Sequence, residues 1–173
     1  MPATYTLISS NVLSSSAASV TFSAIPATYT DLVIRMSTRS DKASWLQEVY
    51  FKFNADTTTK YSYTALIGTS SAASSTRVSN DTSATGSVTV AASSTASTFA
   101  STELYLPSYL ASQNKPLSII DAPEMNNTAN FQMEAVASLY RSTTAISSIE
   151  IGLVGAGNYV SGSSFYLYGI SNA

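Results

Sequence analysis

The stretch that decides the fold is Phe131-Gln132-Met133-Glu134-Ala135-Val136-Ala137-Ser138-Leu139. Every odd position holds an apolar residue, and three of the four even positions hold a polar one. A repeat of two residues places alternate side chains on opposite faces of a strand. The pattern therefore predicts a β-strand whose odd positions pack on a core while its even positions meet water.

The same alternation recurs along the chain, and no segment of similar length shows a helical repeat. Within 31–39, for example, Leu32, Ile34 and Met36 share one face, and within 47–54 Val49 and Phe53 do the same. About ten short strands without crossover helices predict an all-β protein, an antiparallel β-sandwich of the jelly-roll or Greek-key type. The strands are expected at 4–12, 17–25, 31–39, 47–54, 61–67, 86–91, 101–106, 116–121, 130–140, 146–154 and 163–170.

The length of 173 residues predicts a single domain over 1–173. One segment has a different composition, because 68–101 is almost wholly Ser, Thr, Ala and Gly, with Val88 and Val90 able to anchor one weak strand. We expect a loop or insertion there. It is either a mobile loop or a surface insertion that orders against a neighbouring subunit, since long loops in compact domains are often functional.

The composition excludes several kinds of chemistry. The chain has no His and no Cys, which removes the usual general base near neutral pH, thiolate metal sites, a Cys nucleophile and the commonest zinc ligands. Only 10% of residues are charged and the net charge is −2, so no basic stripe for nucleic acid is visible. No apolar run approaches the ~20 residues of a membrane span, and the N-terminus lacks the regions of a secretory signal. We expect a protein made in a cytosol that stays soluble, without nucleic-acid or membrane partners.

Short motifs that resemble known sites are better explained as turns and loops. The glycines of Gly152-Leu-Val-Gly155-Ala-Gly157 stand in the reverse order of a phosphate-binding loop and precede another strand, which predicts a hairpin turn. The segment Ser112-Gln-Asn-Lys115 matches S-x-x-K of serine acyl enzymes, but it lies between two prolines in a β pattern and has no companion motifs. A polar loop is the simpler interpretation.

Oxygen-bearing and aromatic residues also suggest binding sites. Asn54 and Asp56 could bind Ca²⁺, but the EF-hand spacing is absent and a self-capped turn is favoured. Asp121 and Glu124 could serve as acid and base in glycoside cleavage, although solvated loop charge is the default. A second set of residues could form an exposed ladder for sugar or protein, or else a packed face or subunit contact: Tyr50, Tyr166 and Tyr168. No catalytic, cofactor-binding or metal-binding residue is assigned.

Three further stretches carry a family resemblance. Leu7-Ile-Ser-Ser-Asn11 leads to Ser19-Val-Thr-Phe22 and to Ile25-Pro with Tyr29-Thr-Asp-Leu-Val33; Phe53-Asn54 leads to Tyr61-Ser-Tyr-Thr64; and Gly162-Ser-Ser-Phe165-Tyr-Leu-Tyr-Gly-Ile170 stands near the end. Together they resemble short β-sandwich virion proteins of tailed phages from aquatic and cyanobacterial hosts, which occur as capsid cement or decoration proteins and as tail-fibre modules. The resemblance skips the Ser/Thr/Ala-rich middle and carries over no site residues.

The resemblance implies a bacteriophage virion structural protein rather than an enzyme. The first expectation is a homotrimeric cement protein, assembled in the host cytoplasm, that sits on the outer capsid surface and bridges neighbouring capsomers of the major capsid protein. The alternative is a tail fibre or spike module that recognises host-surface polysaccharide, with Trp45 and the tyrosines stacking on sugar rings. A depolymerase is disfavoured, because no acidic pair is recognisable. No cofactor is expected.

Overall fold

The computed structural model describes residues 4–69, 72–126 and 132–171, and twelve strands lie within these ranges. The described residues contain no helix with the length and hydropathy that a membrane crossing requires. The strands are β1 (Tyr5–Val12), β2 (Ser19–Phe22), β3 (Asp31–Thr38), β4 (Leu46–Phe53), β5 (Tyr61–Gly68), β6 (Ala73–Asp81), β7 (Ala84–Val90), β8 (Ala100–Leu106), β9 (Lys115–Ala122), β10 (Met133–Tyr140), β11 (Ile149–Leu153) and β12 (Ser164–Ile170).

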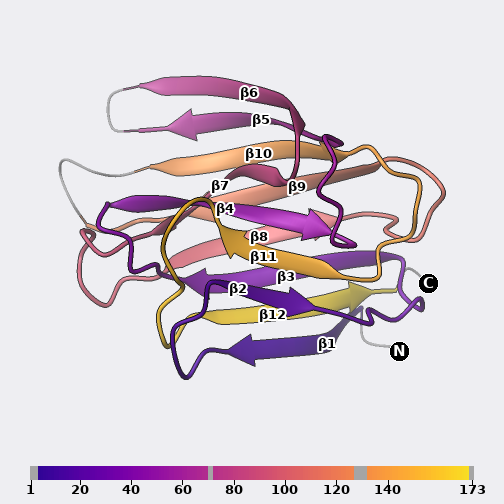
Figure 1. Cartoon of the computed structure of the whole chain (residues 1–173), viewed down its shortest axis with the longest axis horizontal. Helices are drawn as coiled ribbons and strands as arrows, with labels where there is room; N and C mark the ends of the chain where they lie inside the picture. The colour runs from indigo at the N-terminus through magenta and orange to yellow at the C-terminus, as the bar shows by residue number, and fades with distance from the viewer. Residues whose placement is uncertain (1–3, 70–71, 127–131, 172–173) are drawn as a thin grey trace.

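The strands form two antiparallel sheets packed face to face, which confirms the predicted all-β sandwich (Figure 1). The eight-stranded sheet has the order β1-β12-β3-β8-β9-β10-β5-β6, and the four-stranded sheet has the order β2-β11-β4-β7. Without β5, β6, β9 and β10, the two sheets have the orders β1-β12-β3-β8 and β2-β11-β4-β7. When these eight strands are renumbered 1 to 8 along the chain, the orders become 1-8-3-6 and 2-7-4-5. That arrangement is a jelly roll.

The four other strands extend one sheet of the roll. β5 and β6 are inserted between β4 and β7, and β9 and β10 are inserted between β8 and β11. The two insertions meet where β10 pairs with β5, so they form one continuous ladder beyond β8 (Figure 1). We call β5, β6, β9 and β10 the extension.

The prediction of a loop over 68–101 differs from the structure. This range contains all of β6 and β7 and the start of β8, and β7 is buried along its whole length. The predicted weak strand at 86–91 corresponds to β7. β6 was not predicted, because it has water on both faces and so lacks the apolar alternation.

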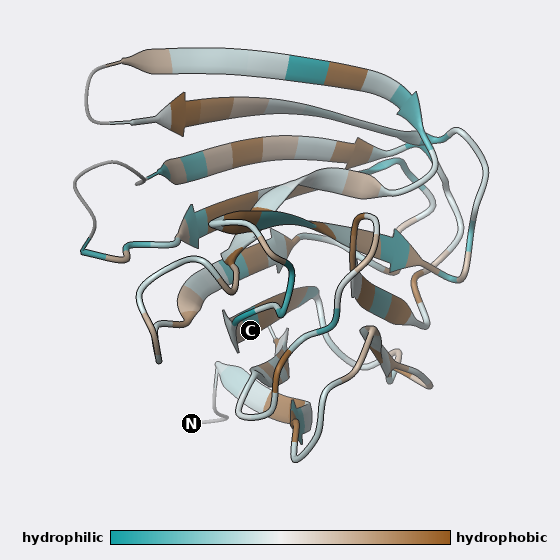
Figure 2. Cartoon of the chain, turned by 60° about the vertical axis from the view of Figure 1, so that its left-hand side comes forward, coloured by the Kyte–Doolittle hydropathy of each residue, from teal (hydrophilic) through white to brown (hydrophobic). Residues whose placement is uncertain are grey.

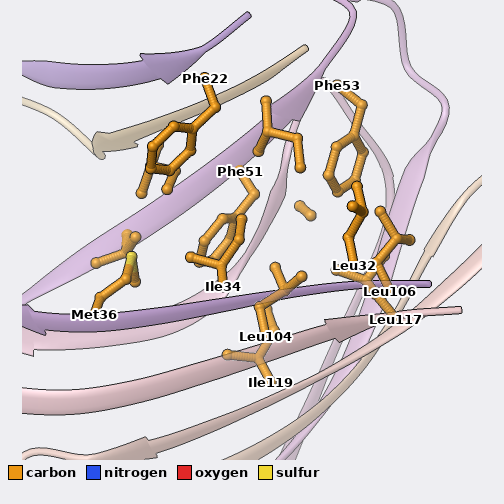
Figure 3. Close-up of a cluster of buried hydrophobic side chains, with 14 of the residues drawn as sticks. Phe22, Leu32, Ile34, Met36, Phe51, Phe53, Leu104, Leu106, Leu117 and Ile119 are labelled. Carbon is orange, nitrogen blue, oxygen red and sulfur yellow. The ribbon is translucent and has the colours of Figure 1, made fainter. Parts of the chain in front are cut away.

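The core lies between the sheets and follows the predicted alternation in several strands. Phe51 and Phe53 of β4 point from one sheet toward Ile34 and Leu104 of the other (Figure 3). Full burial of one such side chain contributes about 1.5–3 kcal/mol to stability. One end of this core is aromatic, because the rings of Tyr61 and Tyr140 stack at 4.7 Å and the ring of Phe53 lies 5.5 Å from that of Tyr140.

The stretch 131–139 forms a strand as predicted, but the predicted direction of its faces is wrong. In β10 the even positions Glu134, Val136, Ser138 and Tyr140 point into the sandwich, and the apolar odd positions from Met133 to Leu139 face outward. Phe131 lies outside the described residues. The side of the eight-stranded sheet that faces away from the core therefore receives apolar side chains, and we call it the outer face.

Candidate interaction surface

The outer face exposes large hydrophobic side chains on neighbouring strands. An antiparallel sheet with one solvated face ordinarily alternates apolar residues inward and polar residues outward. Here Leu66 of β5 is 58% exposed, Ile120 of β9 is 46% exposed and Met133 of β10 is 55% exposed. Figure 2 shows the hydrophobic residues as brown bands along these strands.

Three of these side chains form a contiguous group because their strands are adjacent. Ile120 lies directly opposite Ala135, and Ala135 lies opposite Leu66, so one cross-strand row joins β9, β10 and β5. Met133 lies two residues before Ala135 on the same face. We call Leu66, Ile120, Met133 and Ala135 the aliphatic patch. Exposed groups of apolar side chains on a soluble protein mark sites of contact with another molecule.

A shallow pocket of about 430 Å³ adjoins the aliphatic patch. It is lined by Met133 and Gly68 together with Thr69, Ala122, Glu124 and Gln132. Among the described residues that line the pocket, Glu124 is the only ionisable one, so this lining is mostly uncharged. It offers a place for a partner side chain.

The opposite half of the outer face is aromatic. The Tyr5 and Tyr168 rings meet edge to face at 6.4 Å, and the Arg35 guanidinium lies 5.5 Å and 6.0 Å from their centroids. Tyr105 belongs to the same half and donates a 2.9 Å hydrogen bond to Asp31. Burial and this carboxylate raise the pKa of the Tyr105 hydroxyl, so it remains a donor. We call Tyr5, Tyr105, Tyr168 and Arg35 the aromatic patch.

The charge of Arg35 in the aromatic patch is paired with a neighbouring carboxylate. Arg35 Nε donates to Glu103 Oε2 at 2.8 Å, and both side chains are about half exposed. Exposed ion pairs of this kind contribute about 0–1 kcal/mol. The pair neutralises itself and leaves the outer face suited to contacts made by apolar area rather than by charge.

Both ends of the eight-stranded sheet are open in the part of the chain that the structure describes. β1 and β6 are the terminal strands, and nearly all their side chains are exposed or half-buried on both faces. Figure 1 shows them at opposite edges of the sheet. Edge strands present unpaired backbone N–H and C=O groups that can pair with another chain.

The tyrosines considered for a ladder are not brought together. Tyr166 and Tyr168 lie half-buried on the outer face, whereas Tyr50 lies on the far side of the four-stranded sheet. Its hydroxyl donates to Glu150 Oε1 at 2.5 Å. Burial, then this carboxylate, raises the pKa of Tyr50 to about 12. Trp45 lies apart from all three, against a small cluster that includes Val90 and Met125.

The oxygen-bearing turn after β4 is committed to internal contacts. The Asn54 side-chain oxygen accepts from the backbone N–H groups of Ser147 and Ser148. Asp56 accepts from the backbone of Thr58, from Lys60 Nζ at 3.0 Å and from the Tyr140 hydroxyl at 2.8 Å. These are the contacts of a self-capped turn, as the sequence favoured.

The serine–lysine motif has no catalytic geometry. Lys115 is fully buried at the start of β9, and its Nζ donates to the carbonyl oxygens of Ala111 and Gln113 at 2.6 Å. Burial lowers the pKa of this amine. Ser112 is exposed in the preceding turn, and the lysine's hydrogen bonds join backbone carbonyls instead of the serine hydroxyl.

The prediction of a hairpin at Gly152–Gly157 is wrong, because β11 and β12 belong to different sheets. The glycines lie at the end of β11 and in the connection that crosses between the sheets. Gly157 is close to Gln47, where a Cβ would lie 2.6 Å from the carboxamide oxygen. These glycines therefore belong to a tight connection from one sheet to the other, and not to a chain reversal within one sheet.

The two carboxylates proposed as an acid–base pair, Asp121 and Glu124, differ in their exposure to solvent. Asp121 is fully buried, and Glu124 is exposed and accepts from the backbone of Asn126. The structure instead places Asp121 opposite Glu134, a residue that sequence reasoning assigned to water. Val136 and Tyr140, apolar at even positions, were the available signal for the correct inward face. Within 4–69, 72–126 and 132–171, no three acidic side chains are grouped closely enough to hold a metal ion.

Comparisons with known proteins identify no family. No family model matches this chain, and no curated protein matches it. Among solved structures it is similar to one described as "Structure of infectious bursal disease virus Gt strain", at 12% sequence identity and a TM-score of 0.13. The match covers 94% of this chain and 41% of that chain, so this chain spans less than half of its length. A similarity this weak carries no argument about fold or function.

Proposed function

We propose that this protein is a bacteriophage virion structural protein, a capsid cement or decoration protein that bridges neighbouring capsomers on the outer shell. The observation that supports the proposal is the outer face, where the alternation of β10 directs apolar side chains away from the core. A sheet that needed only water on this side would carry polar residues there. The partner is the major capsid protein of the same particle.

The apolar side chains of the outer face can supply the binding free energy of such a contact. Leu66, Ile120 and Met133 offer apolar area, and removal of apolar surface from water contributes roughly 25 cal/mol per Å². A cement protein requires binding area, a stable fold and no chemical turnover. We therefore propose that the protein is not an enzyme and uses no cofactor.

A homotrimer is the proposed assembly, with the virion as its final location. The open edges at β1 and β6 support self-association, because pairing between copies protects strand edges from uncontrolled contacts. Oligomerisation also presents several copies of the aliphatic patch at once, which multiplies weak contacts.

The test uses particles that lack this protein and measures their thermal resistance after the purified protein is added. We expect the wild type to bind and to raise the temperature at which DNA is released. The triple variant L66S/I120S/M133S should fold and fail to bind, because it loses apolar area at exposed positions only. V154S is the matched control, since Val154 is 37% exposed outside the outer face.

Two results would contradict the proposal. One is binding of the triple variant at wild-type strength, and the other is bound wild type that confers no resistance. Densitometry of intact particles separates capsid from tail, since cement predicts copies comparable to the capsid protein. A handful of copies per particle would support the alternative tail-fibre role.

A further inference from the structure

The extension packs against β7 through buried polar groups. Asp121 of β9 accepts hydrogen bonds from Ser87 Oγ at 3.0 Å and from the backbone N–H of Val88 at 3.4 Å, both on β7. It also accepts from Thr102 Oγ1 at 2.7 Å. Because β7 is the edge strand of its sheet, this carboxylate satisfies a backbone donor that lacks a strand partner.

Glu134 is the direct cross-strand neighbour of Asp121. The two residues are paired between β10 and β9, and opposite residues on one face have Cβ atoms roughly 5 Å apart. Glu134 is 4% exposed, and one of its oxygens accepts from the Gln132 side chain. The other oxygen, Oε2, is buried with no hydrogen-bond partner. An ionised carboxylate in this position is costly, because half of it lacks compensation.

The groups that face this pair add negative charge. Glu48 of β4 lies nearby and accepts from the backbone of Gly86 at 3.2 Å, and it lines a cavity of about 210 Å³ together with Tyr63 and Glu134. The charge of Asp121 also acts on Tyr159, beside β11, and Asp81, at the end of β6, acts on Tyr63. In the described ranges neither carboxylate of the pair has a Lys or Arg partner.

Burial and mutual repulsion both favour the protonated form. Burial raises the pKa of Asp121 to about 6, although its three hydrogen bonds act in the opposite direction. Burial, then the charge of Asp121, raises the pKa of Glu134 to about 7. Two neighbouring carboxylates that share a site lose their protons in two coupled steps.

We propose that the Asp121–Glu134 pair holds one proton near neutral pH, mainly on Glu134, and that losing it releases the extension from β7. The ionised Asp121 keeps its bonds to β7 while Glu134 is neutral. When both are ionised, Glu134 repels Asp121, which bonds to β7, and it also repels Glu48 of β4 on the other side of the contact between the extension and the jelly roll. We call the contact between the extension and β7 the seam. Its strength is controlled by the proton on the Asp121–Glu134 pair.

The direction of the effect follows from the linkage between protonation and folding. Both groups have higher pKa values in the folded state than in the unfolded state, so their stabilising contribution is complete below about pH 4. It is lost as the pH rises through about 6 to 7. The seam is therefore tight in mild acid and loose in mild alkali.

The experiment measures hydrogen exchange at the Val88 amide between about pH 5.5 and pH 8.5, corrected for intrinsic exchange. We expect protection to fall by about tenfold or more in the wild type, since each pH unit above the pKa changes the ionised ratio tenfold. In E134Q, which removes the charge and keeps the shape, protection should stay nearly constant. E103Q is the matched control, because Glu103 is exposed on the outer face, and it should behave as the wild type.

A second measurement on the wild type does not depend on how E134Q folds. The side-chain carboxyl carbons, followed by NMR, should include one Glu that titrates near pH 7. The proposal is overturned if every Glu carboxyl titrates below about pH 5.5. It is equally overturned if E134Q retains the wild-type dependence of Val88 protection on pH.

Discussion

Tyr50 lies across the backbone of Gly152 on the outside of the four-stranded sheet. The two residues are directly opposite on β4 and β11, and a Cβ added to Gly152 would meet Tyr50 Cζ and Oη at 2.4 Å. The hydroxyl is tied to Glu150, which limits how far the ring can move aside. The glycine is required by the ring rather than by backbone conformation.

We expect G152A to lower the free energy of unfolding by about 1–3 kcal/mol, the usual cost of overpacking. In Y50A the space beside residue 152 is open, so adding G152A to that variant should cost less than it does in the wild type. Urea unfolding of the wild type, both single variants and the double variant measures the coupling. Strictly additive changes would show that the ring and the added methyl group do not compete.

Single residues also show how far the sequence could predict the site. The period of two in 131–139 identified β10, but it placed Glu134 in water and Met133 in the core. A sequence pattern that alternates apolar and polar residues normally points its apolar side inward, and β10 does the reverse. The outer face and the acid pair were missed for the same reason, since both depend on this one inversion.

At the scale of elements, every strand of the structure except β6 overlaps a range predicted from the sequence. Leu32, Ile34 and Met36 of β3 are buried as predicted, and β4 follows the same rule. β6 was missed because Val78 is its only large aliphatic residue and water reaches both faces. Which strands share a sheet could not be predicted, because pairing of β5 with β10 joins segments far apart in the chain.

The open edges lead to a prediction about assembly. We expect the wild type to sediment as a trimer of the 18.2 kDa chain and S75K, on β6, to sediment as a monomer. Lysine on an edge strand opposes pairing because its charge must be desolvated. S118K, on the outer face of β9 and away from the edges, is the control and should remain trimeric. A wild type that is monomeric at all concentrations would rule out the proposed trimer.

For the whole molecule, two groups of carboxylates set opposite limits on stability. The hydrogen bonds from Thr58, Lys60 and Tyr140 hold the pKa of Asp56 below its usual range, although burial opposes them. A lowered pKa contributes stability above the unfolded value, and this is lost as the pH falls. The buried pair behind β7 acts in the other direction, so stability should be greatest in mild acid.

D56N tests the acid limit. Below about pH 4 Asp56 becomes protonated in the wild type, and the loss of its stabilising contacts should lower the free energy of unfolding by about 1–2 kcal/mol. The ion pair with Lys60 contributes little of this, because solvent screens the exposed lysine. In D56N that part of the fall should be missing, although the variant is less stable at neutral pH. Urea midpoints measured between about pH 2.5 and 6 give the comparison, and E124Q serves as an exposed control. An acid limb of equal slope in D56N and wild type would exclude this role.

The extension also has a consequence for biosynthesis. Its two halves come from insertions separated by β7 and β8, so β5 and β6 leave the ribosome well before the β10 strand that will flank them. Until β10 is synthesised, the β5–β6 hairpin has two unpaired strand edges. Non-local pairing of this kind is slow. The serine and threonine residues of β6 give this unpaired hairpin a hydrated surface, which opposes aggregation of the nascent chain before β10 pairs with β5.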